Sequence, residues 1–107
     1  MGFLDTLSRV AEAAMQKAEE VNERMERYMR EYDRLSDEQL IQRFRRESGM
    51  RKVACMNVIK SRGYQDYMEN YDSLDDGELV RKYRESSGVE KLACENLIRK
   101  RKAERNS

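Results

Sequence analysis

The sequence of 107 residues has no histidine, no proline and no tryptophan, and it contains only two cysteines. A chain without histidine lacks the side chain that most often serves as general base and as transition-metal ligand. Two lone thiolates, from Cys55 and Cys94, cannot complete a tetrahedral zinc site. The sequence also has no glycine-rich phosphate loop and no base placed to activate a serine or a cysteine. These absences predict a protein that is not an enzyme and that holds no metal and no cofactor.

Long hydrophobic runs are missing as well. No segment comes near the run of about 18 apolar residues that a transmembrane helix needs. The N-terminus has no basic region followed by an apolar core, which a secretory signal would have. We therefore expect a cytoplasmic protein. In that compartment a disulfide between Cys55 and Cys94 is disfavoured, so both cysteines are expected to be small buried residues.

Charged residues make up 40% of the chain and hydrophobic residues 38%, against roughly 25% and 45–50% in an average globular protein. Such a composition predicts a thin core and a large charged surface. The many Glu, Arg, Lys, Leu, Met and Ala residues favour helices, and we expect an all-α fold. The net charge is only +1, but residues 32–63 carry 8 basic and 4 acidic side chains, so positive charge is concentrated in that segment.

The most informative pattern is an internal duplication with an offset of 39 residues. Residues 32–62 align without a gap to residues 71–101, with 14 identities in 31 positions. The repeating unit covers residues 24–62 (repeat 1) and 63–101 (repeat 2). A period of this length is typical of stacked helical units and predicts two tandem helical repeats. The pattern is compatible both with repeats that pack together and with repeats that act separately.

Each repeat carries signals for helix starts and stops. Ser36 and Gln39 form a capping box before the second expected helix, and Asp75 occupies the equivalent position in repeat 2. Gly49 and Gly88 follow these helices, where a left-handed residue commonly ends a helix. A third helix is expected after each glycine.

An apolar heptad pattern precedes and enters repeat 1. Apolar or small residues alternate in steps of three and four from Leu4 to Leu35, which predicts a long amphipathic helix over residues 1–31 whose end belongs to repeat 1. A helix of this length exceeds the diameter of a compact domain of this size, so its first part needs cover from another chain. We expect a homo-oligomer formed through the self-association residues Leu4, Leu7, Ala11, Ala14, Met15, Ala18 and Val21.

A nucleic-acid interface is the main alternative. In each repeat the two helices around the Ser-Gly pair resemble a helix-turn-helix in length and topology, with Gly49 or Gly88 at the turn. Arg45 and Arg84 stand where this motif normally has a small residue, and the second helix of repeat 2 carries glutamates on its outer side. The expected face for a partner or for nucleic acid consists of Arg51, Lys52, Asn57, Lys60, Lys91 and Asn96.

The two ends of the chain carry weaker signals. The first six residues fit the broad N-myristoylation pattern, and the apolar stripe behind them makes peripheral membrane association the third hypothesis. The basic C-terminal tail of residues 102–107 has two interpretations, which are a nucleic-acid contact and favourable charge at the end of the last helix. Among all these hypotheses we favour a non-enzymatic helical adaptor that binds a protein partner and self-associates through its N-terminal helix.

Overall fold

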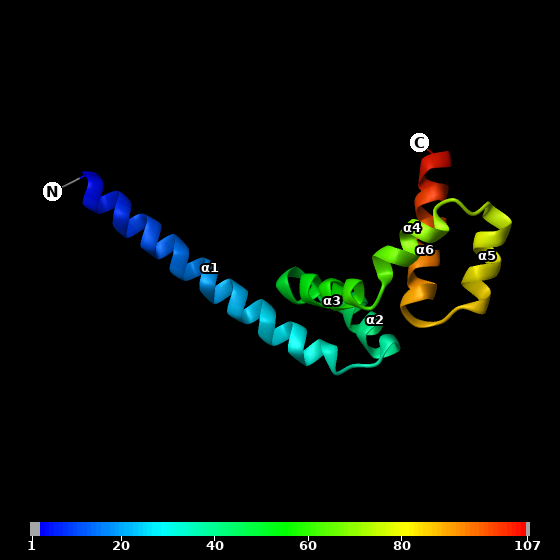
Figure 1. The fold of residues 1–107 in the computed structure, drawn as a ribbon, viewed down its shortest axis with the longest axis horizontal. Helices are drawn as coiled ribbons and strands as arrows, with labels where there is room; N and C mark the ends of the chain where they lie inside the picture. The colour runs from blue at the N-terminus through cyan, green and yellow to red at the C-terminus, as the bar shows by residue number, and fades with distance from the viewer. Residues whose placement is uncertain (1–2, 107) are drawn as a thin grey trace.

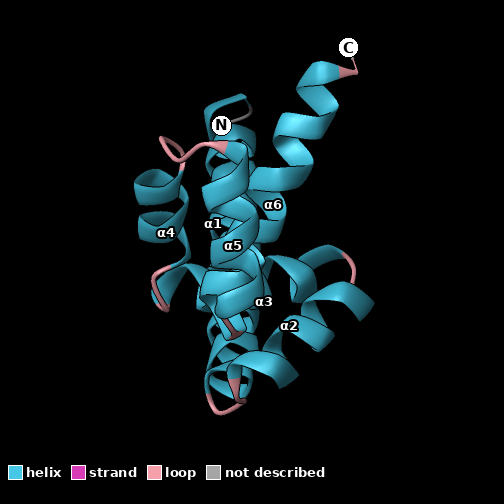
Figure 2. Ribbon diagram, turned by 90° about the vertical axis from the view of Figure 1, so that its right-hand side faces the viewer, coloured by secondary structure: helices cyan, strands magenta, loops and turns pink. Residues whose placement is uncertain are grey.

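A computed structural model describes residues 3–106, with side chains described from Lys17 to Asn106. Over residues 3–106 the chain forms six helices and no strand, which confirms the all-α prediction (Figure 1). Short loops join the helices (Figure 2). The helices are α1 (Phe3–Asp33), α2 (Asp37–Arg46), α3 (Gly49–Ser61), α4 (Tyr64–Tyr71), α5 (Asp76–Glu85) and α6 (Gly88–Arg105).

Helix α1 extends away from the other helices, and the molecule measures 69 × 35 × 22 Å (Figure 1). The C-terminal part of α1 packs against α3, where Tyr32 is buried and Met25 and Tyr28 are half-buried. By contrast, every side chain from Lys17 to Arg24 is exposed. The part of α1 that belongs to repeat 1 therefore contributes to the core, and the described part that precedes it contributes nothing.

The capping box predicted at Ser36 is present at the start of α2. The Ser36 hydroxyl accepts a hydrogen bond from the backbone N–H of Gln39 at 3.3 Å, and the Gln39 side chain accepts one from the backbone N–H of Ser36 at 3.2 Å. At the start of α5, the Asp75 carboxylate accepts from the backbone N–H of Glu78 at 2.8 Å. In each of these helices, the cap side chain thus accepts a hydrogen bond from a first-turn backbone N–H group that has no partner within the helix.

Gly49 and Gly88 both have a φ of 62°, which confirms the predicted left-handed backbone at these positions. An L-residue in this conformation costs roughly 1–2 kcal/mol, because its Cβ approaches the neighbouring carbonyl oxygen. Glycine avoids that cost, and it lets the chain turn sharply from α2 into α3 and from α5 into α6.

An arginine at the same position of each repeat forms hydrogen bonds between two segments of that repeat. Arg62 follows α3 and bonds to the segment that leads into α2, and Arg101 of α6 bonds to the segment that leads into α5. Arg62 donates to the Asp37 carboxylate at 2.8 Å and to the carbonyl oxygens of Asp33 and Leu35 at 3.1 and 2.7 Å. Arg101 donates to the Asp76 carboxylate at 3.0 Å and to the Asp72 carbonyl oxygen at 2.9 Å. Charge-assisted bonds of this kind fix where the loops lie.

The two repeats pack on each other, with α2 against α6 and α3 against α4. The larger core cluster combines Leu40 and Ile59 of repeat 1 with Val89 and Leu92 of repeat 2, so repeat 2 completes the core of repeat 1. A smaller cluster inside repeat 2 is built on Leu79, Cys94 and Leu97. Both cysteines are free and buried, as the sequence predicted.

Candidate functional site

The residues predicted to mediate self-association lie on the extended part of α1. The side chains of Leu4, Leu7, Ala11, Ala14 and Met15 lie outside the described residues. Ala18 is exposed, and Val21 is 44% exposed although it is a large aliphatic residue. One turn further along α1, Met25 is half-buried and packs against the core. The described part of the seam therefore leaves the core and continues into solvent.

The basic residues predicted on α3 are exposed, but two of them lie over aromatic rings. The Arg51 guanidinium carbon is 4.7 Å from the centre of the Tyr28 ring, and the Lys52 ammonium is 4.8 Å from the centre of the Phe44 ring. Lys60 is exposed in the last turn of α3. Cation–π contacts of this kind place the long basic side chains against the surface while their charge stays accessible to solvent.

Asn57 and Asn96 do not share that exposed face. Both are half-buried, and both point toward the first helix of their own repeat. The Asn57 amide donates to the sulfur atom of Met25 at 3.9 Å, and the Asn96 amide donates to the Tyr64 hydroxyl at 2.8 Å. Met25 and Tyr64 occupy equivalent repeat positions. This asparagine therefore holds two helices of the repeat together and is turned away from the face where base contacts would form.

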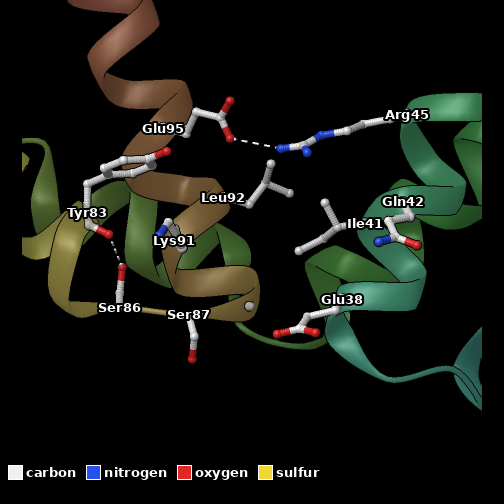
Figure 3. Close-up of a pocket in the computed structure, with 11 residues that line it drawn as sticks. Glu38, Ile41, Gln42, Arg45, Tyr83, Ser86, Ser87, Lys91, Leu92 and Glu95 are labelled. Carbon is white, nitrogen blue, oxygen red and sulfur yellow. Dashed lines mark hydrogen bonds and ion pairs between the residues drawn. The ribbon is translucent and has the colours of Figure 1, made fainter.

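Lys91, the equivalent of Lys52, lies at the junction between the repeats. It is half-buried, and its ammonium is 4.8 Å from the centre of the Tyr83 ring. It lines a hollow between α2 and α6, together with Glu38 of α2 (Figure 3). The structure thus separates Lys91 from the exposed basic residues of α3.

The hollow marks an interface that the sequence analysis did not identify, in which α2 of repeat 1 covers one face of α6 of repeat 2. We call this the covered α6 face; its residues are Gly88, Lys91, Leu92 and Glu95. Ile41 of α2 lies opposite Leu92, which is 5% exposed (Figure 3). Arg45 of α2 forms an ion pair with Glu95 at 3.0 Å.

Gly88 completes the covered α6 face. A Cβ atom at Gly88 would lie 2.5 Å from the Asp37 carboxylate oxygen and 3.1 Å from the Asp37 Cβ, so any other residue there would force the Asp37 side chain aside. Asp37 also receives the hydrogen bond from Arg62. Glycine is thus favoured at position 88 for two reasons, which are its left-handed backbone and the carboxylate packed against it.

The same positions on α3 are uncovered. We call them the open α3 face; its residues are Gly49, Lys52, Val53 and Met56. Val53, the equivalent of Leu92, is 51% exposed, and a Cβ atom at Gly49 would meet nothing within 4 Å. Met56, the equivalent of Glu95, is half-buried. Only Arg51 and Lys52 are charged beside Val53, so the sequence alone does not distinguish this residue from the buried apolar residues of α3.

The titratable groups of the core do not favour nucleophilic chemistry. Burial raises the pKa of the Cys55 thiol and also that of the Cys94 thiol. A raised pKa lowers the thiolate fraction at neutral pH, and the thiolate is the reactive form. The strongest shift belongs to Tyr71, whose hydroxyl donates to Glu90 at 2.7 Å. This hydrogen bond, together with burial, raises the pKa of Tyr71 to about 12.

Among the side chains described from Lys17 to Asn106, no group of three or more Cys, Asp or Glu residues is arranged to hold a metal ion. No helix among residues 3–106 is both long enough and apolar enough to cross a membrane.

The two repeats thus present one covered and one uncovered version of the same helix face, and the described seam of α1 is uncovered as well. Comparison of the chain with known protein families, with curated proteins and with solved structures gave no match.

Proposed function

We propose that this protein is a helical scaffold for protein–protein association, built from an N-terminal helix through which it self-associates and two tandem repeats. The observation that carries the proposal is the exposed stretch of α1 from Lys17 to Arg24 with Val21 on its seam. A helix that continues past its own domain while keeping an apolar seam exposes surface that association would bury.

The heptad pattern supports self-association in particular. Ala18 and Val21 are spaced from the packed residues Met25, Tyr28 and Tyr32 in steps of three and four. The same stripe therefore packs against α3 from Met25 to Tyr32 and is exposed at Ala18 and Val21, just before that packed part. Two such helices side by side could bury their small and aliphatic residues closely, as in a coiled coil with an alanine-rich seam.

The chemistry of the repeats supports a protein partner over nucleic acid. Asn57 and Asn96, the side chains suited to reading adenine, are engaged inside the repeats. On α6, Glu95 pairs with both Arg45 and Arg99, and its charge would repel phosphate. Nucleic-acid affinity depends on phosphate contacts from clustered basic residues, and the structure divides the basic residues among separate faces.

Sedimentation velocity over a concentration series tests self-association. The full chain is expected to sediment as an oligomer at tens of micromolar, and Val21→Glu is expected to shift it to monomer, because a carboxylate on the seam opposes burial. Arg27→Gln is the matched control, since it makes the same change in net charge on the opposite side of α1. A wild-type chain that stays monomeric with its helix content intact would contradict the proposal, as would equal effects of the two substitutions.

A further inference from the structure

One helix face occurs twice in this chain, and one copy is covered by a helix while the other is open. Helix α2 lies across the covered α6 face, and no described residue lies across the open α3 face at Gly49 or shields Val53. At equivalent positions both faces have a glycine, a lysine and an aliphatic residue, which are Gly49/Gly88, Lys52/Lys91 and Val53/Leu92. The covered copy therefore shows how a helix docks on such a face.

The covered copy requires three contacts from the docking helix, spaced four residues apart. Asp37 packs its carboxylate against Gly88 at the start of α6. Ile41 then meets Leu92, and Arg45 pairs with Glu95 (Figure 3). An acid, an aliphatic residue and a basic residue at positions i, i+4 and i+8 of the docking helix thus match glycine, leucine and glutamate on the covered α6 face.

A helix that docks on the open α3 face must differ from α2 at its third contact and must carry more negative charge. At its first two contacts, Gly49 and Val53 match the same acid and aliphatic residue that Gly88 and Leu92 contact on α2. At the third position Met56 replaces Glu95, so an apolar residue fits there and an arginine does not. Lys52 lies beside these three residues, and Lys60 lies further along α3. Both lysines are exposed, and neither forms an ion pair with another described residue.

We propose that the open α3 face binds an acidic amphipathic helix of a partner protein, with an acid at i, an aliphatic residue at i+4 and a further apolar residue at i+8. The acid would lie at Gly49, the aliphatic residue on Val53 and the second apolar residue on Met56. Carboxylates beside this row would face Lys52. The inference rests on the proposed scaffold function and names the site and the chemical class of its partner.

A second copy of the chain is a poor occupant of this face. The segment of repeat 2 that corresponds to α2 is α5, and its equivalent of Ile41 is Val80. Arg81 and Arg84 flank Val80 where α2 has Gln42 and Arg45, and glycine replaces the acid of Glu38. Docking of α5 on α3 would supply Asp76 at i and Val80 at i+4, but it would place Arg84 at i+8, where Met56 offers no carboxylate partner. It would also bring Arg81 and Arg84 toward Lys52, and like charges brought together in an interface are costly.

The test uses a labelled peptide made from residues 35–48 of this chain, which already has Ser36 as its cap and Asp37 and Ile41 at i and i+4. A lactam between position 43 and Glu47 holds it helical, because isolated helices of this length are marginal in water. Its substitutions are Leu40→Gln, Arg43→Lys, Phe44→Gln, Arg45→Leu and Arg46→Glu. Binding to the full-length protein is measured by fluorescence anisotropy.

The peptide is expected to bind the wild-type chain, and Val53→Glu is expected to weaken binding about tenfold or more, because it places a carboxylate in the centre of the contact. Lys52→Glu should weaken binding and remove its salt dependence. Lys100→Glu makes the same charge reversal on the exposed side of α6 and should leave binding unchanged. Circular dichroism verifies that each variant is folded, which the exposure of Val53 leads us to expect.

Three results would overturn the inference. They are no binding up to about 1 mM, equal binding to wild type and Val53→Glu, and an equal loss with Lys100→Glu. A DNA duplex whose binding falls with Lys52→Glu but not with Val53→Glu, and which displaces the peptide, would assign the face to nucleic acid instead. Val21→Glu should not affect the peptide titration, so failure of this inference and failure of self-association are distinguishable.

Discussion

The two sequence repeats share their helix caps, their left-handed glycines and their arginine contacts, but they use other equivalent positions differently. In repeat 2 the Tyr71 hydroxyl donates to Glu90, whereas in repeat 1 the buried Tyr32 hydroxyl lies beside the Arg51 guanidinium without the geometry of a hydrogen bond. Position 90 of repeat 2 corresponds to position 51 of repeat 1, where an arginine replaces the glutamate acceptor. The core and turn residues of the repeats agree, and the residues next to them determine which groups are satisfied and which faces are covered.

This comparison shows that a duplicated framework does not carry a duplicated surface. Leu92 is buried beneath α2 because repeat 1 precedes repeat 2, and Val53 is exposed because no third repeat stands before repeat 1 in the described chain. The glutamate that pairs with Arg45 is found on the covered face alone. Paired substitutions at equivalent positions separate what belongs to the repeat from what belongs to the interface.

The largest expected difference is between Leu92→Glu and Val53→Glu. Leu92→Glu should lower the free energy of unfolding by about 3–4 kcal/mol, because it buries a carboxylate against Ile41. Val53→Glu should change it by less than about 0.5 kcal/mol, as exposed substitutions usually do. Urea unfolding followed by circular dichroism measures both values. Similar losses at the two positions would show that the open α3 face is covered in solution.

A smaller difference is expected between Gly88→Ala and Gly49→Ala. Both place an alanine at a φ of 62°, which costs roughly 1–2 kcal/mol in each case. Gly88→Ala also forces the Asp37 carboxylate aside, so we expect a further loss of about 1 kcal/mol as its bond to Arg62 weakens. Thermal unfolding of the two variants gives the difference. If both lose the same stability, Asp37 moves without cost and the close approach of α2 is not specific.

Next in size is the difference between the two repeated arginines. Arg62→Ala removes three hydrogen bonds, two of them to backbone carbonyl oxygens, and should cost about 1.5 kcal/mol. Arg101→Ala should cost about 0.5–1 kcal/mol, because Arg105 also pairs with Asp76 and would keep that carboxylate partnered. Denaturant midpoints report both values. Arg62→Lys is the control, since it retains the charge but cannot reproduce the forked geometry, and it should recover less than half of the loss.

Local features of the fold could be predicted from the sequence. The capping box at Ser36 and the left-handed glycines depend on residues within a few positions of each other, and their rules do not require the rest of the chain. Burial of Cys55 and Cys94 followed from their place within apolar helix positions. Each of these expectations is confirmed by the structure.

Features that depend on packing between the repeats could not be predicted. Ile41 meets Leu92 of the other repeat, and no periodicity within one repeat indicates that α2 would lie on α6. The orientation of Asn57 likewise depends on where α1 crosses α3, so its polar character alone suggested an outward role. The sequence alignment of the repeats shows that Arg62 and Arg101 are identical. It does not show their hydrogen bonds to backbone carbonyl oxygens, because these depend on loops whose positions are known only from the fold.

A difference of similar size is expected between the half-buried Tyr71 and the buried Tyr32. Tyr71→Phe removes the hydrogen bond to Glu90 and should cost about 1 kcal/mol, at the low end for a bond to a charged group because the pair is only half-buried. Tyr32→Phe removes a hydroxyl that forms no hydrogen bond with the described residues, so the free energy of unfolding should stay within about 0.5 kcal/mol or rise. Urea unfolding at neutral pH compares the two variants.

The pH dependence of Tyr71 sharpens this last prediction. The pKa of Tyr71 is about 12 in the folded chain against an ordinary value of 10.0, so the folded state holds this proton more tightly than the unfolded state does. Its stabilising contribution is therefore complete below pH 10 and is lost as the pH rises toward 12. The stability difference between wild type and Tyr71→Phe should be constant near neutral pH and shrink above pH 10. Glu90→Gln should lower the pKa of Tyr71, measured as tyrosinate absorbance, because a neutral amide no longer opposes ionisation of the phenol. If Glu90→Gln leaves that titration unchanged, burial alone raises the pKa, and the two tyrosines differ less than their hydrogen bonds indicate.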